Sequence, residues 1–114
     1  MKRDWELIRQ ILITVENAEA DDRISDNDLG CSEETFHYNA ILLSQAGLVQ
    51  AMILPNLNTT LIEGLTWEGH EFLDAIRDEA TWQLIKQTAA EKSIALSFAA
   101  IKAIAQHFFN AKFI

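Results

Sequence analysis

Positive charge is missing from the middle of the sequence, because no Lys or Arg occurs between Arg23 and Arg77. The same interval holds eight carboxylates, and the formal net charge of the whole chain is −8. These carboxylates belong to Asp26, Asp28, Glu33, Glu34, Glu63, Glu68, Glu71 and Asp74. Because proteins bind nucleic acids mainly by neutralising phosphates with Lys and Arg, this interval is poorly suited to a nucleic-acid interface.

Cysteine and long apolar runs are also scarce. The single cysteine, Cys31, has no second cysteine in this chain with which to form a disulfide. No apolar run approaches the ~20 residues of a membrane-spanning helix. Residues 1–5 lead into an amphipathic pattern and not into the unbroken apolar region of a signal peptide. We therefore expect a cytoplasmic protein that does not bind membranes.

The apolar residues that are present fall into helical and strand-like patterns. With 114 residues and 49% hydrophobic content, the chain can build one core. Trp5, Ile8, Leu12 and Val15 recur at helical spacing and predict a first helix over residues 4–17, with Asp4 as its N-cap. Capping residues then predict a helix of one or two turns over residues 25–30.

The third predicted helix covers residues 32–45. Ser32 is its expected N-cap, and Glu33 and Glu34 lie in the first turn, where the helix dipole favours anions. Its inward stripe is Phe36, Ala40 and Leu43. The residues left nearer to solvent, which a partner would meet, are Glu33, His37, Tyr38, Ile41, Ser44 and Gln45.

The rest of the chain predicts a hairpin followed by helices. The hairpin has strands at 48–54 and 59–62 joined by a turn. Helices follow at 66–78, at 81–92 after a kink near 79–80, and from residue 97. This order predicts a mainly α fold with a small β-hairpin, an α+β class. It is that of a winged-helix-like domain over 1–79 with a C-terminal helical extension, 80–114, packed on or extending the same domain.

Three segments resemble a known family. They are the opening residues 1–9, the block 38–48, and above all residues 64–77, which read GLTWEGHEFLDAIR. In these segments the chain resembles an uncharacterised family of small bacterial and phage proteins of unknown function. The resemblance implies a winged-helix-like domain, frequently encoded in phages or mobile elements. It supplies no biochemical activity and no functional residues to carry over.

The physical interpretation of residues 64–77 is mostly structural. We expect Thr66 to cap a helix and Gly69 to permit a close backbone approach. Trp67, Phe72 and Leu73 are expected to lock that helix to the hairpin and the first helix. The alternative is that Trp67 is exposed and anchors a partner, because Trp is enriched at interface hot spots.

Two patterns invite a chemical interpretation. His70 and Asp74 have the i, i+4 spacing of zinc-protease ligands, but Asp replaces the second His and no third ligand has diagnostic spacing. Cys31 lies near a helix N-terminus, where a thiol pKa can be depressed, although packing in the turn explains it more simply. No complete catalytic constellation is present, so we expect no enzyme, no cofactor and no metal.

We therefore predict a non-catalytic protein-interaction module. Its candidate partner-binding residues are Glu33, Glu34, His37, Tyr38, Ile41 and Trp67. The alternative is a DNA-binding regulator of the winged helix-turn-helix type, which would need a basic face formed by Lys2, Arg3, Arg9, Arg77, Lys86, Lys92, Lys102 and Lys112. The aromatic residues of segment 107–114 favour either core packing or a homodimer through the C-terminal helix.

Overall fold

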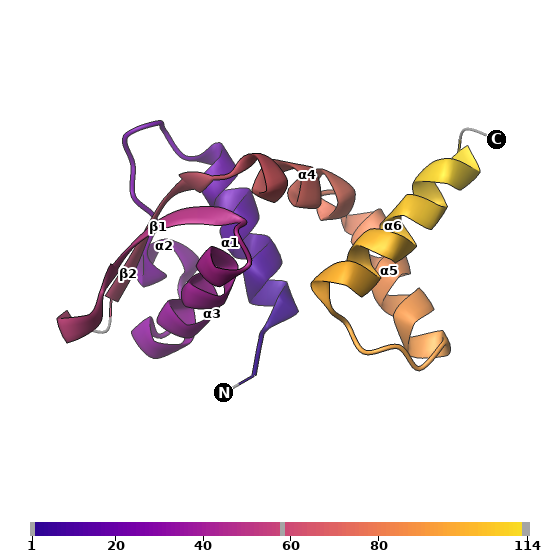
Figure 1. The fold of residues 1–114 in the computed structure, drawn as a ribbon, viewed down its shortest axis with the longest axis horizontal. Coiled ribbons are helices and arrows are strands. Elements are labelled where there is room, and N and C mark those ends of the chain that lie inside the picture. Colours follow the sequence, from indigo (N-terminus) through magenta and orange to yellow (C-terminus); the bar gives the residue numbers. More distant parts are fainter. Residues whose placement is uncertain (1, 58, 113–114) are drawn as a thin grey trace. The chain divides into compact units, whose positions relative to one another are not determined.

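The computed structural model describes residues 2–57 and 59–112. The chain divides into two compact units, residues 1–73 and residues 74–114. It is mainly helical and contains one two-stranded antiparallel sheet (Figure 1). This confirms the predicted α+β class with a small hairpin. The predicted domain boundary after residue 79 stays a prediction.

Helix α1 (Trp5–Asn17) begins where the sequence predicts, because the Asp4 side chain accepts a hydrogen bond from the Leu7 amide at 3.1 Å. Its buried apolar stripe consists of Ile8, Ile11, Leu12 and Val15. A buried amide joins the start of α1 to α3, since Asn39 Oδ1 accepts from the Asp4 amide at 3.0 Å. The other end of the Asn39 amide donates to the Thr35 carbonyl within α3.

Helices α2 (Asp26–Leu29) and α3 (Glu33–Gln45) come next in the chain. Just before α2, Ile24 forms an isolated β-bridge with Ile62 of the sheet. A capping box between Ser25 and Asp28 then starts α2. Ser32 caps α3 by accepting from the Thr35 amide at 3.1 Å. The predicted stripe of α3, Phe36, Ala40 and Leu43, is buried together with Asn39.

The sheet is the predicted hairpin. Strand β1 (Val49–Leu54) pairs with β2 (Thr59–Leu65), and a 3-10 turn (Pro55–Leu57) joins them. β2 is longer than predicted, because a register shift between Gln50 and Ala51 allows pairing to continue to the Val49–Leu65 pair. α1 and α3 both contact β2, so the first unit has its core between these helices and the hairpin.

Helix α4 (Trp67–Ile76) is joined closely to the end of α3. The Thr66 hydroxyl donates to the Gly47 carbonyl at 2.6 Å and accepts from the Gly69 amide at 3.0 Å, which confirms it as the cap. An ideal Cβ on Gly69 would overlap the Leu48 carbonyl oxygen, so the predicted close approach is real. Phe72 is buried against Trp5 of α1, with ring centroids 6.4 Å apart.

The second unit contains α5 (Glu79–Glu91) and α6 (Phe98–Lys112), which pack on each other. The expected kink at 79–80 and start at Thr81 are wrong. Asp78 instead caps a new helix by accepting from the Thr81 amide at 2.9 Å. Among its described residues, the buried side chains of this unit are Ile76, Trp82, Ile85, Ala89, Ile101, Ile104 and Ala105. Among the described residues, no helix is long and apolar enough to cross a membrane.

Candidate functional site

The N-terminal turn of α3 presents two carboxylates to solvent. Ser32 begins the helix, and Glu33 and Glu34 occupy its first turn, where both are exposed. The helix dipole stabilises anions at this end, and it does so although no Lys or Arg occurs in this part of the sequence. The N-terminal end of α3 is therefore exposed and anionic.

Two side-chain hydrogen bonds join α3 to the hairpin. The Thr59 hydroxyl donates to Glu33 Oε1 at 2.9 Å. The buried Thr60 hydroxyl and His37 Nδ1 are 2.7 Å apart. His37 is therefore half-buried against β2, and it offers a partner less of its ring than the helical spacing alone predicts. Glu33, His37 and the start of β2 act as one surface.

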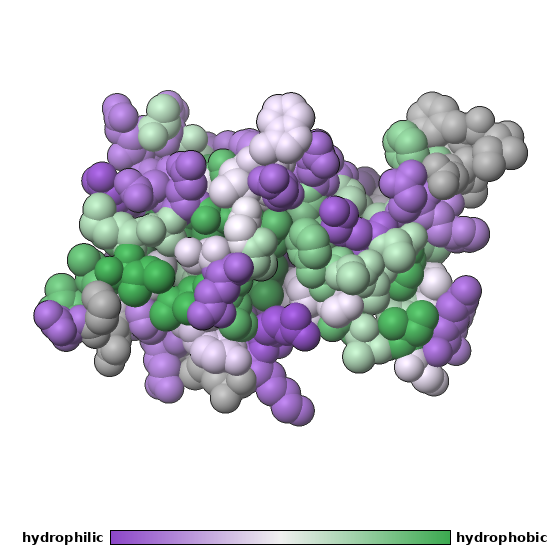
Figure 2. All heavy atoms as spheres, viewed as in Figure 1, coloured by the Kyte–Doolittle hydropathy of each residue, from purple (hydrophilic) through white to green (hydrophobic). Residues whose placement is uncertain are grey.

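The hairpin next to this acidic end exposes three large apolar side chains. Met52 is 38% exposed, Ile53 41% and Leu57 67%. Met52 and Ile53 are successive residues of β1 and therefore point to opposite faces of the hairpin, and Leu57 lies in its turn. We call these three exposed side chains the hairpin patch. Figure 2 shows strongly hydrophobic atoms over the part of the molecule where Figure 1 draws the hairpin. Sequence reasoning missed this patch, although an apolar Leu57 inside a polar turn was a usable signal.

Tyr38 and Ile41 are half-buried on α3. Tyr38 lies away from the hairpin contacts, since it lines a recess with Lys2, Arg3 and Trp5 at the start of α1. The sequence-predicted candidates on α3 therefore divide between the hairpin side and the α1 side of the helix.

Trp67 lies on another helix, α4, and is 75% exposed. Its indole N–H donates to Glu71 Oε1 at 2.6 Å, one helical turn away. The expectation that Trp67 locks α4 onto the hairpin is wrong, because Phe72 and Leu73 supply that buried face instead. An exposed indole held by a carboxylate agrees with the alternative, a partner anchor.

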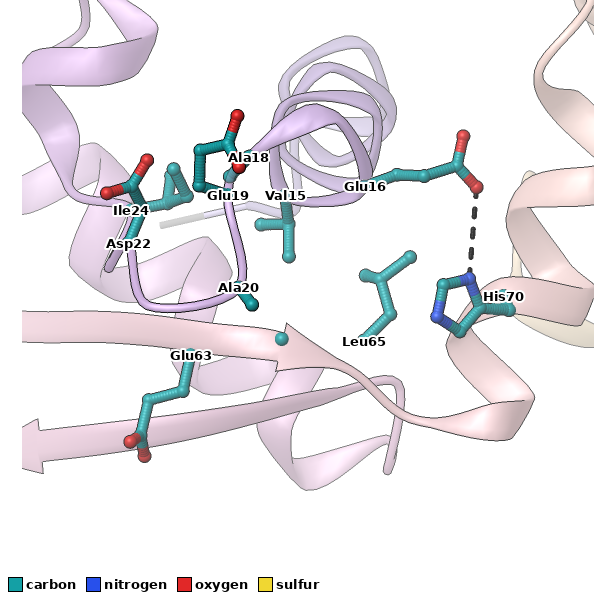
Figure 3. Close-up of a pocket in the computed structure, with 11 residues that line it drawn as sticks. Val15, Glu16, Ala18, Glu19, Ala20, Asp22, Ile24, Glu63, Leu65 and His70 are labelled. Carbon is teal, nitrogen blue, oxygen red and sulfur yellow. Dashed lines mark ion pairs between the residues drawn. The ribbon is translucent and has the colours of Figure 1, made fainter.

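A small recess lies between α1, the following loop and the end of β2 (Figure 3). Its volume is about 250 Å³. Val15 and Leu65 form part of its apolar wall, whereas Glu63 turns its carboxylate outward (Figure 3). The residues around it that carry a carboxylate or an imidazole are Glu16, Glu19, Asp22, Glu63 and His70. This recess adds a second acidic area to the first unit.

The His70–Asp74 pair does not form the metal site considered from its spacing. His70 Nδ1 lies 3.8 Å from Glu16 Oε2, whereas Asp74 binds Arg77 at 2.8 Å. Over residues 2–57 and 59–112, no group of three or more His, Cys, Asp or Glu side chains is placed to hold a metal ion.

The surroundings of Cys31 disfavour its thiolate form. Burial, reinforced by the nearby Asp26 carboxylate, raises the pKa of the Cys31 thiol above its ordinary value. A reactive cysteine needs the opposite shift, because the thiolate is the nucleophile. The packing interpretation of Cys31 therefore fits its surroundings better than the catalytic one.

Comparison with known proteins gives a family without an assigned activity. The family model described as "Hypothetical protein (DUF2513)" matches residues 2–95. An uncharacterized protein of Haemophilus influenzae is 43% identical over 110 residues, which cover 93% of each chain. No solved structure matches the chain significantly. The match to most of the chain shows that it belongs to the DUF2513 family of hypothetical proteins.

Proposed function

We propose that the chain is a cytoplasmic, non-catalytic protein-interaction module built on a winged-helix-like unit. The order α1, Ile24 bridge, α2, α3, hairpin and α4 supports that description of the first unit. The hairpin patch and the acidic end of α3 form its binding surface. The partner is a protein surface with Lys or Arg side chains beside apolar ones.

The observation that carries this proposal is that exposed apolar side chains of the hairpin lie near two exposed carboxylates at the start of α3. Thr59 joins the hairpin to Glu33 at 2.9 Å, so the two areas are neighbours. Ile53, which shares a face of the hairpin with its partner Thr60, and Leu57 in the turn offer the apolar centre that protein interfaces use. Glu33 and Glu34 offer a charged rim. Opposite charge on a partner would steer its approach and fix its orientation.

The alternative, a DNA-binding regulator, has less support. Its recognition helix and wing would contain no Lys or Arg between residues 24 and 76. Of the basic residues that could form a face elsewhere, Arg9 is only 5% exposed and contributes little to any surface. An association with phages or mobile elements stays part of the proposal and is supported by the sequence resemblance alone.

A peptide-array experiment with the full chain tests the proposed surface. We expect peptides that combine Lys or Arg with apolar residues to bind in a salt-sensitive way. Leu57→Ser and Glu34→Lys should each weaken binding about tenfold, which corresponds to about 1.4 kcal/mol. Leu84→Ser and Glu91→Lys are matched controls, because these residues are exposed on α5.

Two outcomes of this experiment would count against the proposal. Equal binding of peptides with and without basic residues would remove the role of the carboxylates. Equal losses in the α5 controls would mean that the hairpin patch and the end of α3 are not the binding surface.

We also propose that the chain forms a homodimer through α6. Phe109 on α6 is 57% exposed, which supports an apolar contact there. Phe113 and Ile114, which the sequence argument also used, lie outside the described residues. Light scattering of the full chain and of Phe109→Ser tests this. A monomeric mass for the unaltered chain would contradict it.

A further inference from the structure

A recess of the opposite charge lies at the start of α1. It is lined by Lys2, Arg3, Trp5, Tyr38 and Leu42 and has a volume of about 490 Å³. We call it the N-terminal cleft. Two of the lining residues, Lys2 and Arg3, are cationic, and none is anionic, although the net charge of the chain is −8. It is therefore chemically unlike the acidic surfaces described above.

The cleft is positioned by the fold. The Asp4 amide donates to Asn39 Oδ1 at 3.0 Å, and Asn39 is 1% exposed. This bond fixes the chain directly after Lys2 and Arg3 against the middle of α3. Tyr38 and Leu42 are four residues apart, so they share one face of that helix. The cleft thus forms where two elements are held together by a buried hydrogen bond.

Its side chains suit a carboxylate next to an aromatic or apolar group. The Arg3 guanidinium carbon lies 5.2 Å from the centroid of the Trp5 ring. A guanidinium at this distance makes a cation–π contact with the ring, and N–H groups that do not face the ring can bind a carboxylate. Trp, Tyr and Arg are also the residue types most enriched at the hot spots of protein interfaces.

We propose that the N-terminal cleft binds a peptide segment of a partner protein in which an Asp or Glu carboxylate lies beside an aromatic or apolar side chain. The carboxylate binds Arg3 and Lys2, and the apolar side chain packs on Trp5, Tyr38 and Leu42. This inference rests on the proposed function as an interaction module. It concerns a different surface and a partner segment of opposite charge.

Charge distinguishes a peptide from a nucleic acid as the occupant. Two cations are sufficient for one carboxylate, whereas a polyanion gains affinity from each phosphate that is neutralised. A strand leaving the cleft along α3 would meet Glu34, which is exposed one turn before Tyr38. The net charge of −8 adds repulsion over a longer range. A short acidic segment avoids most of this cost.

The test measures binding of the full chain to an array of peptides that contain Asp or Glu next to Phe, Trp or Leu. A matched array replaces every Asp and Glu by Asn and Gln. We expect the acidic array to bind at least about tenfold more tightly than the amide array. Arg3→Gln should remove about tenfold of that preference, and Tyr38→Ser should weaken both arrays. Lys92→Gln removes an equal charge from an exposed site and should change neither.

Several results would overturn the proposal. The first is equal binding of the acidic and amide arrays, and the second is an unchanged preference for acidic peptides in Arg3→Gln. The third is that oligothymidylate binds, that Arg3→Gln abolishes this binding, and that acidic peptides do not bind. Binding of the basic peptides described under the proposed function serves as the folding control, because Arg3→Gln should leave it unchanged. If basic peptides bind and acidic ones do not, only the cleft proposal is wrong. If neither binds, the proposed function is wrong as well.

Discussion

At Gly69 the fold leaves no room for a side chain. The Thr66 hydroxyl holds the first turn of α4 on the Gly47 carbonyl, and this brings Gly69 against the Leu48 carbonyl. A Cβ at that position would force the backbone of Leu48 or Gly69 to move. This close contact explains one glycine of the block GLTWEGHEFLDAIR in structural terms.

Gly69→Ala should therefore destabilise the first unit by about 2 kcal/mol or more, as overpacking against rigid backbone does. Urea unfolding measures this change. Gly64→Ala is the control, because a Cβ there would meet no heavy atom within 4 Å, and it should change stability by less than about 0.5 kcal/mol. Equal stability of the two variants would show that the approach to Leu48 is not a constraint in solution.

Cys31 gives a pH-dependent prediction. Burial, and then the Asp26 carboxylate, raises the pKa of the Cys31 thiol, so the folded chain holds this proton to higher pH than the unfolded chain. Stability from this group is complete below the pKa of the unfolded thiol and falls as pH rises above it. Alkylation by iodoacetamide should have a higher pH midpoint in the native protein than in urea. A lower native midpoint would restore the hypothesis of an activated thiol.

Single residues also show how far the sequence could predict the structure. The caps Asp4, Ser32 and Thr66 were predictable, because each depends on a local hydrogen bond within three residues. The exposure of Trp67 was not predictable, since a large apolar residue in a helix is usually assigned to the core. The buried positions of Phe72 and Leu73 on α4 were predicted correctly, and only tertiary contacts decide that Trp67 does not join them.

At the scale of elements, the hairpin and α3 are joined by polar contacts. Thr60 is 1% exposed, and its hydroxyl lies 2.7 Å from His37 Nδ1. Because an unpaired buried hydroxyl is costly, this pair should contribute more to hairpin stability than the exposed pair of Thr59 and Glu33.

A double-mutant cycle with Thr60→Val and His37→Ala should give a coupling free energy of about 1 kcal/mol in urea unfolding. The same cycle with Thr59→Val and Glu33→Ala should give a smaller value. Similar couplings in the two cycles would mean that burial does not strengthen the His37 contact.

Element order was largely predictable from periodicity, whereas two boundaries were not. The helix break before α5 depends on Asp78 competing as a cap with continuation of α4, and sequence alone does not rank the two. The length of β2 depends on a register shift in the ladder, which involves both strands. For the candidate site, spacing placed Glu33 and Glu34 at the exposed end of α3. It could not reveal the N-terminal cleft, because Lys2 and Tyr38 are distant in sequence.

At the scale of the whole molecule, the distribution of charge and of exposed apolar side chains supports the proposed protein partner over a nucleic acid. The 24–76 interval contains no Lys or Arg, and the exposed apolar residues of the hairpin lie in the same interval. A polyanion would be repelled by this surface, whereas a basic and apolar protein surface would match it. The central claim is therefore that the first unit does not bind duplex DNA.

The most direct measurement is the fluorescence anisotropy of a labelled random-sequence DNA duplex titrated with the full chain at low salt. The account predicts no rise in anisotropy up to micromolar protein, the range in which non-specific DNA-binding proteins bind. A rise that falls steeply with added salt, and that Glu34→Lys strengthens, would contradict it and place the α3 end on a duplex.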